Sequence, residues 1–361
     1  MYKGTGISKD QLSDDGEPCI LYGELYTKYK SETIREVISK TNIDNTKLAR
    51  SKANDVIIPC SGETAEDIAT ARCVLNGNIL LGGDLNIIRL HGYDGTFMSY
   101  QLNGKRKYDI AKVAQGVSVV HLYGEHLKGV KTINPCLTEQ KKIASLLTLL
   151  DERIATQNKI IEDLKKLKSA IIEKLYKEIQ GTWYSYRQLF SIINERNKQL
   201  EYSNVLSASQ ERGMVSREDL NLDIHFERSN ISTYKIVKNG DYVIHLRSFQ
   251  GGFAFSEKTG ICSPAYTVLR PNNLLMYGYL SNYFTSRDFV KSLIIVTYGI
   301  RDGRSINVDE WLDMKVVIPS KEQQTHIVNV IESIENKIKN EETYSNCLLN
   351  QKQYLLRQMF I

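Results

Sequence analysis

The sequence of 361 residues contains one long segment twice, and this repeat limits the folds that the chain can adopt. The first copy follows Thr132–Pro135 and ends at Tyr176, and the second follows Val316–Pro319 and ends at Phe360. The copies align without a gap, as the following pairs show: Pro135 and Pro319, Gln140 and Gln324, Ile143 and Ile327, Ile154 and Ile338, Leu164 and Leu348, Lys168 and Lys352. The chain therefore reads as globular region, repeated segment, globular region, repeated segment.

Both copies have the apolar spacing of a long amphipathic helix. Apolar residues recur at steps of three and four, which is the seam of a coiled coil. The first seam is Ile143, Leu147, Leu150, Ile154, Ile161, Leu164, Ile171 and Leu175, and the second is Ile327, Ile331, Ile334, Ile338, Leu348, Leu355 and Met359. About forty residues at about 1.5 Å each span about 60 Å, which exceeds the diameter of a small domain. The two helices are therefore expected to pair with each other, in antiparallel directions.

Further apolar residues widen the stripe on the first helix. They are Leu146, Leu149, Ile160, Leu167 and Ile172. A stripe wider than one seam indicates that the helix also packs against a globular region or a partner protein. We therefore take these five residues as candidates for partner binding.

The regions between the helices alternate short apolar runs with Gly, Asn and Asp, which is typical of β-strands and turns. Two short segments recur in both regions: Lys52–Ile58 resembles Lys238–Ile244, and Leu85–Arg89 resembles Tyr266–Arg270. The sequence thus predicts an α+β fold, with two similar mixed α/β domains separated by two long antiparallel coiled-coil helices. The expected boundaries are 1–135 (the first head), 136–178 (first helix), 179–319 (the second head) and 320–361 (second helix).

Composition excludes several classes of protein. The six cysteines form no Cys-x-x-Cys pair and the six histidines no His-x-x-x-His pair, so we expect no metal site and a reducing, cytoplasmic location. No apolar run reaches eighteen residues, so we expect no membrane span. The formal net charge of +5 permits an acidic partner, although a mildly basic protein without one fits the charge equally well.

No motif indicates catalysis, a cofactor or nucleotide hydrolysis. An amino-methyltransferase needs an Asn/Asp-Pro-Pro-Tyr/Phe motif, and Ser263-Pro264-Ala265-Tyr266 lacks the leading amide and the second proline. No Gly-x-x-x-x-Gly-Lys-Ser/Thr loop occurs. The chain is therefore expected not to be an enzyme.

Two glycine-bracketed basic loops in the second head are candidates for contact with DNA. Arginine and glutamine can each bond two atoms of a base edge. The candidates in these loops are Arg247, Ser248, Gln250, Tyr298, Arg301 and Arg304, and the weaker candidates in the first head are Tyr22, Glu24, Tyr26 and Ser61. Turns with solvated arginines, and tyrosines of half-buried β-structure, remain alternative interpretations of these residues.

Segments spread over the whole chain resemble the specificity subunit of a type I restriction-modification system. They begin at the following residues: GISKDQLSDDGEPCILYGELYTKY at Gly6, AQGVSVVHLYGEHLK at Ala114, EQKKIASLLTLLDERIATQNKIIEDLKKLKSAIIEKL at Glu139, GDYVIHLRSFQGG at Gly240, GICSPAYTVLRP at Gly260, YGIRDGRSI at Tyr298 and IPSKEQQ at Ile318. The resemblance implies two target recognition domains, joined by two long helices, that read double-stranded DNA without catalysis.

The resemblance also implies partners. Two modification subunits would dock on the helices and methylate adenine with S-adenosylmethionine, and restriction (motor-nuclease) subunits would complete the complex. Trp183–Leu189, which opens the second head, has no counterpart before Gly6, so we expect a first recognition domain truncated at its N-terminus. The alternatives are a coiled-coil scaffold that reads no DNA, and an inactive product of a silent cassette.

Overall fold

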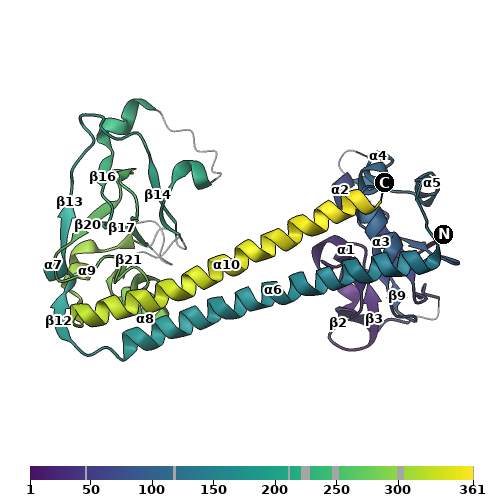
Figure 1. Ribbon diagram of the computed structural model, residues 1–361, viewed down its shortest axis with the longest axis horizontal. Coiled ribbons are helices and arrows are strands. Elements are labelled where there is room, and N and C mark those ends of the chain that lie inside the picture. The colour runs from purple at the N-terminus through teal and green to yellow at the C-terminus, as the bar shows by residue number, and fades with distance from the viewer. Residues whose placement is uncertain are drawn as a thin grey trace. The chain divides into compact units, whose positions relative to one another are not determined.

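The structure is a computed structural model that describes residues 1–44, 47–116, 119–209, 212–220, 228–245, 252–298 and 305–360. The chain divides into two compact units, whose elements Figure 1 labels. Unit 1 comprises Met1–Ile160 and Glu341–Ile361, and unit 2 comprises Ile161–Asn340. Each unit thus contains one head and a part of each long helix.

The first head is built on two sheets. The five-stranded sheet has the order β1 (Tyr2–Lys3), β10 (Leu85–Ile88), β6 (Asp55–Pro59), β8 (Arg72–Val74), β4 (Thr33–Ile34). The four-stranded sheet has the order β2 (Leu12–Ser13), β5 (Ser39–Thr41), β3 (Glu17–Ile20), β9 (Leu80–Leu81). Pairing is antiparallel except between β4 and β8 and between β3 and β9. All five residues of β6 are buried, as expected for a central strand.

Short elements complete the first head. A two-stranded ladder joins β7 (Ser61–Gly62) to β11 (Val120–His121). The helices are α1 (Glu24–Thr27), α2 (Ala65–Ile68), α3 (Gly95–Asn103), α4 (Lys107–Lys112) and α5 (Gly124–Lys128), with a 3-10 turn at Lys9–Gln11. Asp94 caps α3 by accepting a hydrogen bond from the Phe97 amide, and the helix then buries Phe97 and Tyr100.

The second head has a four-stranded antiparallel sheet with four smaller ladders. The sheet has the order β13 (Phe190–Ile193), β20 (Thr267–Pro271), β17 (Tyr242–Ile244), β18 (Phe253–Phe255). The ladders are β12 (Thr182–Ser185) with β23 (Lys315–Ile318), β14 (Leu206–Ser209) with β15 (Gly213–Ser216), β16 (Lys235–Val237) with β19 (Gly260–Cys262), and β21 (Thr297–Tyr298) with β22 (Ser305–Ile306).

Helices and an aromatic cluster fill out the second head. The α-helices are α7 (Tyr186–Leu189), α8 (Arg287–Ser292) and α9 (Val308–Asp313), and the 3-10 segments are Arg217–Leu220, Arg228–Thr233, Tyr283–Thr285 and Leu293–Val296. Trp311 of α9 is fully buried and stacks on Tyr186 of α7, with ring centroids 4.3 Å apart. Such offset aromatic pairs supply large apolar areas, and they hold the helices on the sheet.

The sheets of the two heads repeat each other strand by strand. The order β1-β10-β6-β8 in the first head matches β13-β20-β17-β18 in the second, and all of these pairs are antiparallel. In particular, β1 pairs with β10 as β13 pairs with β20. The expectation of two similar heads is confirmed.

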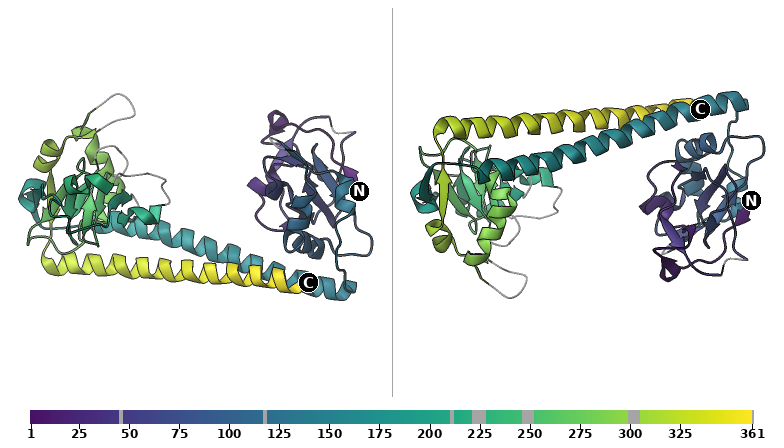
Figure 2. Two further views of the ribbon diagram at one scale, coloured as in Figure 1. Left: turned by 90° about the horizontal axis from the view of Figure 1, so that it is seen from above. Right: turned by 90° about the horizontal axis from the view of Figure 1, so that it is seen from below.

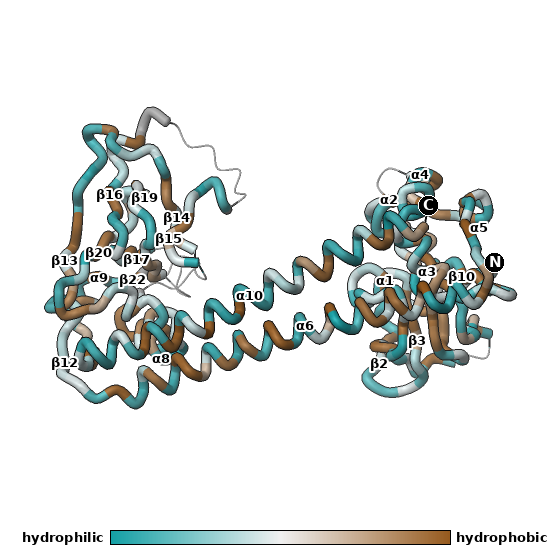
Figure 3. The backbone as a smooth tube through the Cα atoms, viewed as in Figure 1, coloured by the Kyte–Doolittle hydropathy of each residue, from teal (hydrophilic) through white to brown (hydrophobic). Residues whose placement is uncertain are grey.

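Both predicted long helices are present. They are α6 (Leu137–Lys177) and α10 (Lys321–Met359), each within two residues of its predicted bounds. Figure 3 shows apolar residues recurring along both helices. Ser320 accepts a hydrogen bond from the Gln323 amide at the start of α10, which satisfies one of the free amides of the first turn.

Within unit 1, the end of α10 pairs with the first part of α6, as both views of Figure 2 show. Ala144 and Leu147 of α6 form one buried cluster with Phe97 and Tyr100 of α3 and with Phe360. Residues Asp151 and Lys352 are in contact, and so are the more C-terminal Gln157 and the more N-terminal Glu341. The order of these contacts shows that the two helices are antiparallel in this unit.

Within unit 2, the start of α10 pairs with the end of α6. Ile327 and Ile331 share a buried cluster with Ile172 and with the aromatic residues of the second head. Tyr176 packs on Tyr279 and Tyr283, with centroids 5.5 and 5.2 Å apart. The predicted α+β class with antiparallel long helices is therefore confirmed. None of the helices in the described ranges is both long and apolar enough to cross a membrane.

Candidate nucleic-acid interface

An aspartate at the start of a central strand anchors the same region in each head. In the first head, Asp55 accepts hydrogen bonds from Arg89 Nε at 3.0 Å and Nη2 at 2.8 Å, and from the Lys52 amide at 2.7 Å. In the second head, Asp241 accepts from Arg270 at 2.9 and 2.9 Å, and from an amide at 2.8 Å. The bidentate pair holds the strand and the turn before it, because two parallel hydrogen bonds give the guanidinium and the carboxylate a defined mutual orientation.

The amide that donates to Asp241 belongs to Lys238, which is the sequence equivalent of Lys52. Both aspartates are almost fully buried. The two anchors align the central strands, and Ser61 in the first head then corresponds to Arg247 in the second. The sequence repeat that was noticed around these aspartates is therefore also a repeat of side-chain contacts.

The candidates of the second head fall mostly outside the described residues. These are Arg247, Ser248, Gln250, Arg301 and Arg304, while Tyr298 is described only as part of β21. The strands that flank them are described. Ile244 and Phe253 flank the first loop, Val296 and Ile306 flank the second, and all four lie in one buried cluster. The structure thus brings the bases of the two candidate loops to one core.

The first head shows the equivalent segments in direct contact. Ser61 and Gly62 of β7 pair with His121 and Val120 of β11. The segment of β7 corresponds to Arg247-Ser248, and the segment of β11 corresponds to residues near Ser305. The two segments are thus paired in the first head, and the sequence aligns them with the candidate segments of the second head.

Glu24 is held inside the first head. It is 5% exposed, and it accepts hydrogen bonds from the Leu21 amide at 3.0 Å and from Lys28 at 2.7 Å, as well as from the hydroxyl of Ser39. These bonds satisfy a buried carboxylate, as a stable fold requires. Its role in this structure is to hold α1 against β5.

The other candidates of the first head lie nearer the surface, except Ser61. Tyr22 and Tyr26 are half-buried, and Ser61 is 7% exposed. Burial raises the pKa of Tyr26, and the neighbouring Tyr22, Asp67 and Glu63 add to the shift. Tyr26 therefore lies near the carboxylates of Asp67 and Glu63, which repel phosphate.

Comparison with known proteins shows which proteins this architecture resembles. No family model matches the sequence. The type I restriction enzyme MjaVIII specificity subunit of Methanocaldococcus jannaschii is 24% identical over 325 residues, which cover 79% of this chain and 73% of that protein. An alignment that covers 79% of this chain reaches into both heads. The chain thus resembles a type I specificity subunit over most of its length.

Two solved structures share the fold of this chain. The S subunit of a type I restriction-modification system from M. genitalium has a TM-score of 0.56 and 15% identity, covering 100% of this chain and 93% of that one. A chain from a study of the assembly and conformational transition of the type I R-M system has a TM-score of 0.62 and 13% identity, covering 98% and 93%.

Most of the wide apolar stripe on α6 is exposed in this structure. Leu146 is 50% exposed, Leu149 60%, Ile160 41% and Leu167 50%. Ile172 differs, because the core of unit 2 covers it and leaves it 5% exposed. The first four residues form a stripe of large apolar side chains that this chain leaves uncovered.

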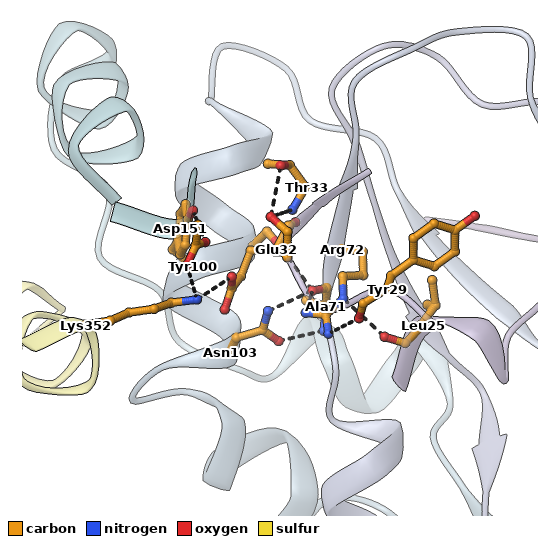
Figure 4. A network of polar contacts seen from close by, with 12 residues as sticks. Leu25, Tyr29, Glu32, Thr33, Ala71, Arg72, Tyr100, Asn103, Asp151 and Lys352 are labelled. Carbon is orange, nitrogen blue, oxygen red and sulfur yellow. Dashed lines mark hydrogen bonds and ion pairs between the residues drawn. The ribbon is translucent and has the colours of Figure 1, made fainter. Parts of the chain in front are cut away.

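Sequence reasoning missed a buried charge network in unit 1, which Figure 4 shows. Lys352 of α10 contacts Glu32 at 2.8 Å and Asp151 of α6 at 2.6 Å, and Tyr100 of α3 donates a hydrogen bond to Asp151 at 2.6 Å. Burial raises the pKa of Glu32 above its ordinary value, and Lys352 opposes this shift. The network joins the first head to both helices.

A lysine interrupts the apolar seam of each long helix, Lys168 in α6 and Lys352 in α10. This interruption is the feature of the sequence that could have indicated the network. Lys168, the repeat equivalent of Lys352, contacts Glu335, the equivalent of Asp151, at 2.5 Å in unit 2. That pair is more exposed, at 27% and 42% for the two side chains. The lysine-carboxylate pair therefore belongs to the repeat, and Glu32 is an addition of the first head.

A glutamine in the first turns of each long helix also holds its own head. Gln140 Oε1 accepts from the Asp94 amide at 2.9 Å, and Gln324 Oε1 accepts from the Met276 amide at 2.8 Å. Both side chains also donate to the carbonyl of the preceding proline, and both are 1% exposed. Alignment of the two copies by sequence identified these two residues as equivalent, but it assigned them no role.

Proposed function

We propose that this protein is the DNA sequence-specificity subunit of a type I restriction-modification complex. It is a non-catalytic subunit in which each head reads one half of a bipartite target in double-stranded DNA. One observation carries the proposal: the chain holds two copies of an Asp–Arg-anchored sheet, each followed by a connection that bears candidate contact residues. The relationship to the M. jannaschii specificity subunit supports it.

The proposed reading residues of the second head are those of its two loops. Arg247, Gln250 and Arg301 carry the groups that bond base edges. Ser248, Tyr298 and Arg304 supply further contacts, and lysines and arginines around them bind phosphates. Tyr22, Glu24, Tyr26 and Ser61 stay candidates for the first head, with Glu24 and Ser61 needing a rearrangement before they can reach DNA.

We propose that the long helices have two tasks. The exposed stripe of Leu146, Leu149, Ile160 and Leu167 docks two modification subunits, since an exposed apolar stripe of this kind marks a protein interface. Restriction subunits complete the complex, and the whole acts in the cytoplasm with no cofactor bound by this chain. The helices also connect the two heads within one chain, so that one polypeptide carries both readers.

An exchange of the second head tests this function. The chain is produced in a host together with its modification subunit, and methylated adenines are mapped over the genome. A bipartite motif is expected, and replacing residues 182–318 by those of another specificity subunit should change one half of the motif and leave the other half unchanged. A methylated motif that stays the same after the exchange would favour a scaffold that reads no DNA.

Substitution of the arginines in the second head is expected to weaken binding to the cognate site. Arg247→Ala and Arg301→Ala should each cost about 1–3 kcal/mol, because each removes a two-atom bond to a base edge. Fluorescence anisotropy of the assembled complex on cognate and scrambled duplexes measures this. The matched control is Arg35→Ala, an exposed arginine of the first head that contacts Glu152. Unchanged cognate affinity in both variants would remove these residues from the interface.

A further inference from the structure

A short hairpin in the first head is the structural counterpart of the second candidate loop. The backbones of Gln115 and His121 bond in both directions, at 2.9 and 2.7 Å. In the second head, Tyr298 pairs with Ser305 in the same antiparallel manner. A helix follows each hairpin after the same interval: α5 begins at Gly124, three residues after His121, and α9 begins at Val308, three residues after Ser305.

Burial confirms this alignment of the hairpins. Leu122, which follows His121, is fully buried, and Ile306, which follows Ser305, is 5% exposed. Gly116 follows Gln115 as Gly299 follows Tyr298 in the sequence. Gly116 has a φ of +129°, and a Cβ atom there would lie 2.0 Å from the carbonyl oxygen of Val119, so only glycine fits this turn.

The side chains at the base of the hairpin are exposed and polar. Gln115 and His121 are both exposed, while Val120 between the turn and His121 is 8% exposed and faces the core. This follows from the alternation of side chains along a strand. The ring of His121 stacks on Tyr123 with centroids 6.2 Å apart and planes at 23°, and Tyr123 contacts His126 edge-on. The Tyr123 ring thus lies beside the imidazole and nearly parallel to it.

We propose that Gln115 and His121, with Tyr123 as their support, are the residues with which the first head reads its half-site. The inference rests on the proposed function and identifies a reading surface within it. The Gln115 amide can donate to and accept from the edge of an adenine, and the His121 ring can donate to an acceptor on a base or a phosphate. Because Tyr123 limits the motion of His121, little side-chain entropy is lost on binding.

This surface is better suited to DNA than the candidates chosen from sequence. Tyr26 is flanked by Glu63 and Asp67, and Glu24 is engaged within the fold. Gln115 and His121 carry no negative charge, and β11 places His121 opposite Ser61, the equivalent of Arg247. The Ser61 segment of the first head therefore meets the hairpin at β11.

Gln115→Ala and His121→Ala test the proposal in the chain produced with its modification subunit. Mapped adenine methylation should show that at least one base pair of one half-site is discriminated about tenfold less well, while the other half-site stays as in the unaltered protein. The matched control, His91→Ala, removes an exposed histidine of the same head and should leave both halves unchanged. The unaltered half-site serves as an internal measure of folding.

The possible outcomes distinguish failure of the hairpin proposal from failure of the proposed function. If the unaltered chain gives a bipartite motif but both alanine variants keep both halves, the hairpin does not read DNA and the proposed function stands. If the unaltered chain directs no sequence-specific methylation, the proposed function and this inference fall together. If an alanine variant loses both halves, the test is repeated with Gln115→Glu and His121→Asn, which keep size and polarity. Retention of both half-sites by these variants overturns the proposal.

Discussion

An Asp241→Ala variant is expected to lose sequence reading by the second head while the first head continues to read its half-site. The substitution removes three hydrogen bonds and leaves Arg270 without its carboxylate partner. Removing one partner of a buried pair costs about 3–5 kcal/mol, and we expect the lower part of this range because Arg270 is 33% exposed. Thermal unfolding monitored by circular dichroism, together with methylation mapping, measures both effects.

The control for this variant is Asp309→Ala in the same head. Asp309 is 85% exposed and lies 3.8 Å from Arg187, so its loss should leave both stability and the methylated motif unchanged. An Asp241→Ala protein that unfolds like the control and keeps both halves of its motif would show that the Asp–Arg anchor does not position the reading loops.

A Lys352→Met variant is expected to be destabilised by about 3–5 kcal/mol. Methionine keeps the apolar stem but leaves Glu32 and Asp151 as buried carboxylates without their shared cation (Figure 4). Lys168→Met is the matched control, because it removes the equivalent lysine from a more exposed pair and should cost about 1 kcal/mol or less. Chemical denaturation of both variants measures the difference, and equal costs would contradict the network's role.

The cost of Lys352→Met is also expected to depend on pH. Burial already raises the pKa of Glu32 above the ordinary value of 4.5, and loss of Lys352 removes a charge that opposes this rise. An acid whose pKa is raised by folding stabilises the fold at low pH and loses that contribution as pH rises through the folded pKa. The penalty should therefore be largest at neutral pH and shrink as pH falls toward 4.5. A loss of unfolding free energy that does not change with pH would show that the ionisation of Glu32 does not cause it.

The sequence predicted features that depend on local periodicity. The spacing of Ile143, Leu147 and Ile154 identified α6 to within two residues, because a helix of that length needs a continuous apolar seam. The resemblance of Lys52–Ile58 to Lys238–Ile244 predicted that the two heads are similar, because both segments carry an aspartate and the strand that follows it. These signals lie within short stretches of chain.

The remaining features depend on contacts between residues far apart in the sequence. From sequence, Glu24 was a candidate for contact with DNA. Its hydrogen bond with Ser39 forms only because β5 brings Ser39 next to it. Lys352 meets Glu32, 320 residues earlier; the lysine in the apolar seam is visible in the sequence, but nothing local to it indicates that Glu32 is its partner. The pairing of β7 with β11 likewise joins residues about sixty apart, so the hairpin at Gln115 could not be found from sequence.

Hydroxyl-radical footprinting of the assembled complex on a duplex that carries its target tests the central claim most directly. Two separate protected segments on one duplex are expected for the unaltered chain, and Asp241→Ala should remove one of them and leave the other. A single protected segment, or a variant that weakens both segments equally, would contradict the claim that one chain carries two independent readers of sequence.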